Sequence, residues 1–339
     1  MLLRNALITM VLGSFLLATN LAQATDPVRI IFDTDMGNDV DDAMALAMIH
    51  ALQKRGKCEL LAVTLTNGHP NAARFVDALN TYYGYGDTPI GAAVNGWKTA
   101  SKYVDLVDQQ QDGKPAYPFE LDEKQLVDSV TLLRKILAAE PDQSVVMIQV
   151  GFSTNLARLL ETAADEISPK NGCELVKQKV KFLSLMAGAF APIQGNPKYV
   201  EYNIMHDIPA CEKLSRDWPT PMVWSGFEIG IAAPYPAVSI EQDYAYTTGH
   251  LVEMAYRLYE PPPHNRPTWD LTSVLYAVAP ERGYFGLSAP GDVEVEKEGA
   301  TTYKPAEQGK HRYLTLTPEQ TTRVVECFVQ LCSEPPLGK

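Results

Sequence analysis

Cysteine is scarce in this sequence and never occurs in a metal-binding pattern. Five cysteines are spread over 339 residues, and none belongs to a C-x-x-C or Cys/His motif. Their odd number and scattered spacing identify no disulfide pair. A dense disulfide framework is therefore excluded, and a thiolate zinc site is disfavoured. The cysteines are Cys58, Cys173, Cys211, Cys327 and Cys332.

Positive charge is also in short supply. Lys and Arg number 29 against 41 Asp and Glu, which gives a formal net charge of −12 at pH 7. Because such a surface repels phosphate-rich partners, we expect no nucleic-acid partner and no binding to anionic membranes. Apolar residues make up 46% of the chain and charged residues 21%, which is ordinary for a globular protein.

The sequence has no apolar run long enough to span a membrane. Its most apolar stretch, Ala6–Leu17, follows a positive Arg4 and precedes a small-residue cleavage pattern that ends at Ala24. These are the three parts of a secretory signal peptide. They predict a signal over residues 1–24, a mature domain over residues 25–339, and export to the periplasm or out of the cell.

Strand-like and helix-like runs alternate along the rest of the chain, without repeats or a convincing linker. This alternation predicts a single α/β domain with an open, mostly parallel central sheet flanked by helices. The expected strands are Val28–Thr34, Glu59–Thr66, Pro89–Val94, Ser144–Val150, Val180–Met186, Met222–Ser225 and two late strands. The expected helices are Asp41–Lys54, Asn71–Tyr83, Lys124–Ala139, Thr154–Ala164, Ile208–Arg216, Tyr244–Tyr259, one from Asp270, and Pro318–Leu331.

The most informative segment is a run of aspartates between the first expected strand and the first expected helix. It contains Asp33, Asp35, Asp39, Asp41 and Asp42. Its apolar flanks place the acids at a strand-to-helix turn, where open α/β sheets bind their ligands. Crowding so many carboxylates costs free energy unless a cation or hydrogen-bond donors compensate for their charge. The alternative, a solvated polar loop without a role, does not explain the apolar flanks.

Polar residues follow the other expected strands as well. Asn67 follows the second strand, and Ser153-Thr154-Asn155 follows the strand that ends at Val150. Further along, Asn196, Glu201 and Asn203 lie within eight residues. The carboxyl ends of parallel strands meet at one edge of the sheet, and amides with carboxylates suit hydroxyl-rich ligands. Together these residues predict a metal and a sugar in one pocket.

Oxygen ligands dominate this predicted site, which favours a hard cation, Ca²⁺ ahead of Mg²⁺. An EF-hand loop counted from Asp33 would require glycine at its sixth position and glutamate at its twelfth. The sequence has Asn38 and Met44 there, so an EF-hand is excluded.

The aspartate run resembles the N-terminal signature of the inosine-uridine-preferring nucleoside hydrolase family. The family has an apolar strand, D-x-D-P-G-x-D-D-A, and then a helix, whereas this chain reads DTDMGNDVDDA from Asp33. Met36 replaces the proline, and two extra residues follow Gly37. The resemblance assigns the metal-binding acids to Asp35 and Asp42 and the ribose-binding acid to Asp41. Asp39 is an additional carboxylate that could take either role, so the assignment among Asp39, Asp41 and Asp42 stays open.

Later segments extend the resemblance over nearly the whole mature chain and imply the Rossmann-like nucleoside hydrolase fold. Val150 stands where the family binds the metal through a backbone carbonyl, and Asp270, preceded by Trp269, stands where a C-terminal aspartate completes the metal shell. The segments with Asn196, Glu201 and Asn203 match the family's ribose clamp, and Asn67 resembles its sugar-contacting asparagine.

The activity that this resemblance implies is hydrolysis of the N-glycosidic bond of ribonucleosides to free base and ribose. Ca²⁺ would bind two ribose hydroxyls and a water molecule, and Asp35 would take a proton from that water. Trp269 replaces the histidine that some members use as an acid, and it either stacks on a purine or packs the start of its helix. His264 and His69 are possible replacement acids, and Trp97 and Tyr103 are possible neighbours of the base. The family commonly forms dimers or tetramers, so a homodimer or homotetramer is possible.

Two other functions stay open. A strand followed by Asp33-x-Asp35 also resembles the haloacid-dehalogenase phosphatases, but Gly37 stands where those enzymes have Thr or Val. An exported nucleoside- or ribose-binding protein that has lost turnover would fit the altered aspartate spacing and the missing histidine. Release of ribose, binding without release, or activity on phosphate esters alone would distinguish the three.

Overall fold

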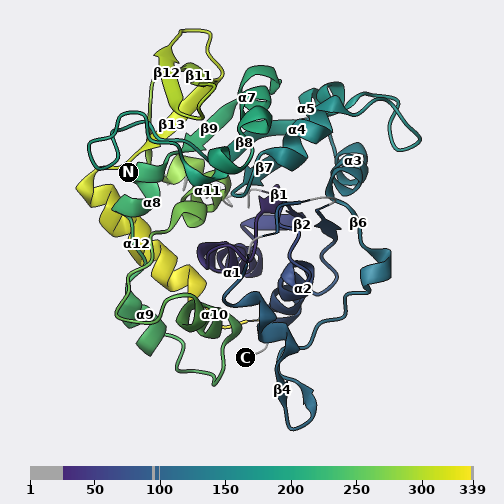
Figure 1. The fold of residues 1–339 in the computed structure, drawn as a ribbon, viewed down its shortest axis with the longest axis vertical. Helices are drawn as coiled ribbons and strands as arrows, with labels where there is room; N and C mark the ends of the chain where they lie inside the picture. Colours follow the sequence, from purple (N-terminus) through teal and green to yellow (C-terminus); the bar gives the residue numbers. More distant parts are fainter. Residues whose placement is uncertain (1–25, 94–95, 99, 337–339) are drawn as a thin grey trace, which may run out of the picture.

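A central sheet of eleven strands organises the part of the chain that the structure describes, residues 26–93, 96–98 and 100–336 (Figure 1). The structure is a computed structural model. The expected signal peptide, residues 1–24, lies outside the described residues. No described helix is long and apolar enough to cross a membrane. The five cysteines all lie in the described part, and each is a free thiol.

Eight strands of the sheet run parallel to their neighbours, in the order β13-β9-β8-β7-β1-β2-β3-β6. The remaining three, β10, β11 and β12, add antiparallel pairs at the β13 edge. The strands are β1 Val28–Thr34, β2 Cys58–Leu65, β3 Ile90–Ala92, β6 Val127–Asp128, β7 Val145–Gln149, β8 Val180–Met186, β9 Met222–Ser225, β10 Gly286–Leu287, β11 Gly291–Val295, β12 Thr301–Pro305 and β13 His311–Thr315. A separate hairpin pairs β4 Gln110–Gln111 with β5 Lys114–Pro115.

Helices cover both faces of the sheet and give it two hydrophobic cores. One core packs under α1, α2, α10, α11 and α12, and the other under α3, α4, α5 and α7 (Figure 1). The helices are α1 Asp41–Lys54, α2 Ala72–Tyr83, α3 Ser129–Ala139, α4 Thr154–Glu161, α5 Gly172–Lys179, α6 Tyr202–His206, α7 Ile208–Asp217, α8 Phe227–Ala232, α9 Ala237–Gln242, α10 Leu251–Tyr259, α11 Trp269–Val278 and α12 Pro318–Cys332. This architecture confirms the predicted fold class.

Two predicted helices begin later than expected because polar residues cap them. Asp128 accepts hydrogen bonds from the backbone of Val130 and Thr131, so α3 starts at Ser129 and not at Lys124. His250 caps Val252, so α10 starts at Leu251 and not at Tyr244. Four observed helices were not predicted. α6, α8 and α9 have only five or six residues, too few to show an apolar period, and α5 is mostly polar, with Leu175 and Val176 as its buried apolar side chains of note.

The strand order places a ligand crevice beside β1. After β1 the chain continues outward to β2 on one side, whereas β7 lies on the other side, so the sheet changes direction between β1 and β7. Ligands of open α/β sheets bind at the carboxyl ends of strands at such a reversal. The aspartate run follows β1, and Val150 follows β7.

Two glycines allow the chain to fold tightly at this crevice. Gly37 has a φ of +113°, which side-chain-bearing residues rarely adopt. A Cβ atom on Gly151 would lie 2.5 Å from the backbone nitrogen of Asp35. The ends of β1 and β7 can therefore meet only because residue 151 has no side chain.

Candidate active site

A pocket of about 300 Å³ lies at the carboxyl edge of the sheet, where β1, β7 and β8 end. Acids, amides and aromatic rings line it together. The lining residues include Asp35, Asn38, Asp39, Val150, Tyr199, Glu201, Tyr202, Asn203, Phe227, Tyr259, Arg266, Trp269 and Asp270. A larger cleft of about 480 Å³ between α7 and β11–β13 shares no lining residue with this pocket.

Three predicted metal ligands, Asp35, Asp42 and Asp270, are buried around this edge, and only two of them line the pocket itself. Within the described part of the chain, one carboxylate oxygen of each, Oδ2, has no hydrogen-bond partner. The other oxygen of Asp42 accepts a hydrogen bond from the Thr34 hydroxyl. Buried carboxylate oxygens need a partner, and a hard cation is the partner that oxygen sets of this kind bind. Each of these oxygens is therefore a candidate ligand for a divalent ion.

The electrostatics of these acids support the same conclusion. Burial, together with the charge of Asp39, raises the pKa of Asp35 well above its usual range. Burial and neighbouring carboxylates act in the same direction on the pKa values of Asp42 and Asp270. Burial also raises the pKa of Glu201 to about 7. Without a cation, these groups hold protons that aspartates in water would have released.

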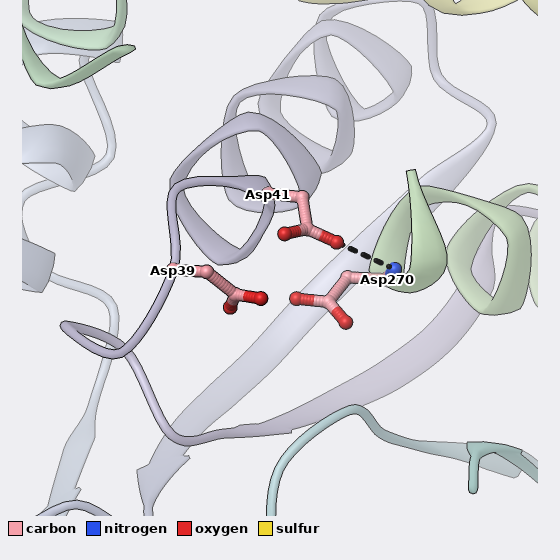
Figure 2. Close-up of side chains that lie close together, drawn as sticks. All are labelled: Asp39, Asp41 and Asp270. Atoms are coloured by element: carbon pink, nitrogen blue, oxygen red, sulfur yellow. Dashed lines mark hydrogen bonds between the residues drawn. The ribbon is translucent and has the colours of Figure 1, made fainter. Parts of the chain in front are cut away.

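A second carboxylate cluster overlaps the first. Asp39, Asp41 and Asp270 bring one oxygen each within 4.8 Å of one another, and their carboxyl groups face a common centre (Figure 2). However, Asp41 already binds an arginine and the backbone N–H of Asp270. A cation at this second cluster would lie beside a guanidinium group. Among the described residues, Asp39, Asp41 and Asp270 are the acids whose oxygens lie this close together, and Asp35 and Asp42 do not form an equally tight group with Asp270.

The predicted carbonyl ligand and two ribose-clamp residues meet in the pocket. The Asn203 amide donates to the carbonyl oxygen of Val150 at 2.7 Å, which leaves that oxygen a second lone pair. Glu201 caps α6 and accepts hydrogen bonds from the backbone of Gly188 and Asn203 at 3.2 and 2.8 Å. Backbone hydrogen bonds thus hold the Glu201 side chain in place at the start of α6.

The structure places Asn67 and Asn196 outside the residues that line the pocket. Asn67 is buried, and its amide donates to the carbonyl oxygens of Asp35 and Met36 at 3.2 and 3.3 Å. Asn67 therefore stabilises the backbone of the aspartate loop. Asn196 is exposed in a turn, where its side chain accepts a hydrogen bond from the backbone of Lys198.

Trp269 lies at the start of α11 and lines the pocket with Phe227 and Tyr259. Its indole nitrogen donates to the Phe227 carbonyl at 2.8 Å, and its ring centroid lies 5.1 Å from that of Phe227. An aromatic wall of this kind can stack on a flat base. The indole also packs against α8, so it has a structural contact as well.

The other aromatic and histidine candidates lie outside the lining of the pocket. Trp97 is 54% exposed and packs edge-on against His206. Tyr103 is fully buried, accepts a hydrogen bond from the Gly37 backbone at 2.9 Å, and donates to the carbonyl oxygen of Asp39 at 2.6 Å. His264 pairs with Glu260 at 3.4 Å, and His69 accepts a hydrogen bond from the Asn71 backbone.

Sequence reasoning missed Arg266, the cation of this site. Its guanidinium donates to Asp41 from Nε at 3.2 Å and from Nη2 at 2.9 Å, and Nη2 also binds Asp39. Arg266 lies 225 residues from Asp41 in the sequence and belongs to no motif. The only sequence signal was indirect: an acid run of this density requires a compensating cation.

Comparisons with known proteins identify the family and the fold of the chain. The family model described as inosine-uridine preferring nucleoside hydrolase matches residues 30–328. A plant nucleoside hydrolase structure, PpNRh1, has 18% identity and a TM-score of 0.68, covering 91% of this chain and 100% of its own. The purine-preferring ribonucleoside hydrolase from Gardnerella vaginalis has 18% identity and a TM-score of 0.66, covering 90% and 98%.

A third structure, the inosine-uridine preferring nucleoside hydrolase from Bacillus anthracis, has 16% identity and a TM-score of 0.64, covering 90% of this chain and 99% of its own. No curated protein matches the chain closely enough in sequence to be counted as a relative. At these identities the three structures establish the shared fold, and the family match establishes the relationship. The chain belongs to the inosine-uridine preferring nucleoside hydrolase family, and its enzyme class is ribonucleoside N-glycosidase.

Proposed function

We propose that this chain is a Ca²⁺-dependent ribonucleoside hydrolase that releases free base and ribose, with Asp35 as its general base. The observation that carries the proposal is the set of buried, unpartnered oxygens on Asp35, Asp42 and Asp270 beside a pocket of sugar-binding size. No phosphate-binding feature of a haloacid-dehalogenase-like phosphatase is needed to explain the site, and the family match leaves that alternative without support.

Asp35, Asp42, Asp270 and the carbonyl oxygen of Val150 would hold the ion. When bound, the ion would supply Lewis-acid activation of water and of ribose hydroxyls. Asp35 lines the pocket, and once the bound ion had displaced its proton, its carboxylate would accept a proton from the attacking water. The surrounding carboxylates stabilise the positive charge that develops on the sugar.

Glu201 and Asn203 supply the ribose contacts, since both line the pocket and are fixed at the start of α6. On the base side, Trp269 offers an aromatic face to a purine. Because an indole cannot act as an acid, stacking must favour protonation of the base from another source. Purine ribonucleosides are accordingly the proposed preferred substrates.

Ribose release tests the proposal directly. The purified protein would be given inosine, adenosine, guanosine and uridine with added Ca²⁺, and the reducing sugar would be measured. We expect release that chelation removes and Ca²⁺ restores. In the Asp35→Asn variant the turnover number should fall roughly a thousandfold, while Asp112→Asn, in the exposed β4–β5 turn, should leave it unchanged.

Two results would contradict the proposal. Activity on phosphate esters alone would indicate a phosphatase. Saturable ribose binding without turnover on any nucleoside would indicate a binding protein that has lost catalysis.

Export through a cleaved signal peptide is also proposed, on the sequence pattern of residues 1–24 alone. Mass spectrometry of the protein from fractionated cells would test it. A mature chain that begins near Thr25 in the periplasm or medium is expected, and an intact Met1 in the cytoplasm would overturn it.

A further inference from the structure

Asp41, the acid that matches the family's ribose ligand, has both carboxylate oxygens engaged within the protein. Oδ1 accepts from Arg266 at 2.9 and 3.2 Å, and Oδ2 accepts from the backbone N–H of Asp270 at 3.3 Å (Figure 2). Its side chain is 1% exposed and does not line the pocket. Asp41 is therefore a poor acceptor for a sugar hydroxyl in this chain.

Asp39 lies closer to the pocket than Asp41 does. Its side chain lines the pocket and is 24% exposed. It belongs to the segment that is two residues longer than the family signature, and its backbone carbonyl is fixed by the Tyr103 hydroxyl. The longer loop thus brings a carboxylate to the pocket wall beside Asp270 (Figure 2).

Arg266 connects the two acids. It is 7% exposed and lies over the rings of Tyr259 and Trp269, at 4.8 and 4.9 Å from their centroids. A third nitrogen, Nη1, donates to the Tyr259 hydroxyl at 3.2 Å. A planar guanidinium can hold two carboxylates and a hydroxyl in fixed directions, which a lysine ammonium cannot do.

We propose that Arg266 is a positioning residue. It occupies Asp41 with hydrogen bonds and holds Asp39 at the pocket wall, so that Asp39 accepts the hydrogen bonds of the ribose hydroxyls. The proposal rests on the proposed ribonucleoside hydrolase function and names the sugar-recognition residues of that same site. Asp39 favours ribose because its fixed carboxylate accepts a hydrogen bond from a ribose hydroxyl. When 2-deoxyribose binds, the carboxylate lacks that partner, and binding is weaker.

The test measures sugar binding separately from turnover. Calorimetry would give the affinities of wild type and Asp39→Asn for ribose, 2-deoxyribose and Ca²⁺. We expect Asp39→Asn to bind ribose about tenfold more weakly, to lose its preference over 2-deoxyribose, and to change Ca²⁺ affinity by less than about threefold. Because Asp39 is partly exposed, this variant should fold even if changes at Arg266 do not.

Kinetics of Arg266→Lys provide the second arm. KM for inosine should rise about tenfold with a smaller change in kcat, since the substitution weakens substrate binding and spares the chemical step. The matched control is Arg257→Lys, because Arg257 pairs with Glu253 at 3.0 Å on α10 and is not among the residues that line the pocket. Its KM should match that of wild type.

Several outcomes would overturn the inference. Unchanged ribose affinity in Asp39→Asn would do so, and so would a loss of Ca²⁺ affinity as large as the loss of ribose affinity, which would make Asp39 a metal ligand. If wild type bound ribose through Asp39 but released none from any nucleoside, the proposed function would fail and this inference would stand. If wild type turned over nucleosides and Asp39→Asn kept its ribose affinity, only this inference would fail.

Discussion

At the scale of single residues, Trp269 raises the question of whether its ring serves the substrate or the fold. The indole lines the pocket, yet it also donates to Phe227 and lies against α8. A Cβ atom on Gly230 would lie 2.2 Å from Cδ1 of Trp269, so α8 can approach the indole only through a glycine. Gly230→Ala should therefore displace the ring without removing it.

If Trp269 stacks on a purine, its removal should affect inosine more than uridine. Trp269→Ala should lower kcat/KM for inosine about tenfold, with a smaller loss for uridine, and Gly230→Ala should show the same selectivity. Steady-state kinetics on both nucleosides would measure this. Equal losses for both substrates would assign Trp269 to packing alone.

Sequence reasoning located the acids of the site better than their partners. Asp35 and Asp42 could be predicted because an apolar strand and a helix flank them within ten residues. Arg266 could not, because nothing local marks an arginine whose partners lie more than 220 residues away. Asn196 belongs to a segment that resembles the family's ribose clamp. In the structure, however, its side chain accepts a hydrogen bond from the backbone of Lys198 within the same turn.

At the scale of elements, the loop between β1 and α1 depends on one buried hydroxyl. Tyr103 accepts from Gly37 and donates to Asp39, so it bridges two points of the loop that carries Asp39. Burial of Tyr103 is complete, so the loss of its hydroxyl would leave two backbone groups without that partner.

Tyr103→Phe should lower the free energy of unfolding by about 1–3 kcal/mol and raise KM for ribonucleosides. Urea denaturation and steady-state kinetics would measure both effects. The control is Tyr303→Phe, whose hydroxyl donates to the Ala289 carbonyl at an exposed site on the β11–β12 hairpin. Equal destabilisation by the two changes would show that the loop has no special dependence on Tyr103.

The ends of a helix or strand could be predicted where its apolar residues and its flanking polar residues indicated the same boundary. The bounds of β1, α1, β8 and β9 are as the sequence predicted, since each is a compact apolar run with clear ends. The predicted helix also covered residues 244–249, which form turns and bends ahead of α10. In the structure His250 accepts a hydrogen bond from the backbone of Val252 and so fixes the start of α10. The spacing of apolar residues in the sequence does not reveal this contact.

At the scale of the whole molecule, the buried acids make stability depend on pH when no cation is present. Burial raises the pKa of Asp33 to about 7, as it does for Glu201, and partial burial together with the charge of Asp41 raises the pKa of Asp39 to about 7. Between pH 4 and 7 the folded chain therefore binds more protons than the unfolded chain. The stabilisation is fully present below pH 4 and is lost as the pH rises through 7.

In chelator, the free energy of unfolding should thus be larger at pH 5 than at pH 8. Added Ca²⁺ should stabilise the protein more at pH 8 than at pH 5, because protons compete with the ion for the same oxygens. Urea denaturation at both pH values, with and without Ca²⁺, would test this. Greater stability of the chelated protein at pH 8 would contradict it, and Glu201→Gln should reduce the pH dependence.

The long-range contacts of Asp41 have a consequence for the order of folding. Asp41 meets Arg266 and Asp270 across 225 and 229 residues, so the pocket cannot close until that late segment of the chain has been made. Closing so long a loop is slow, and until it closes the crowded aspartates repel one another. A chain that crosses a membrane unfolded would therefore assemble its ion-binding oxygens only at its destination. Under the proposed export and Ca²⁺ dependence, ion binding would follow the closure of this loop.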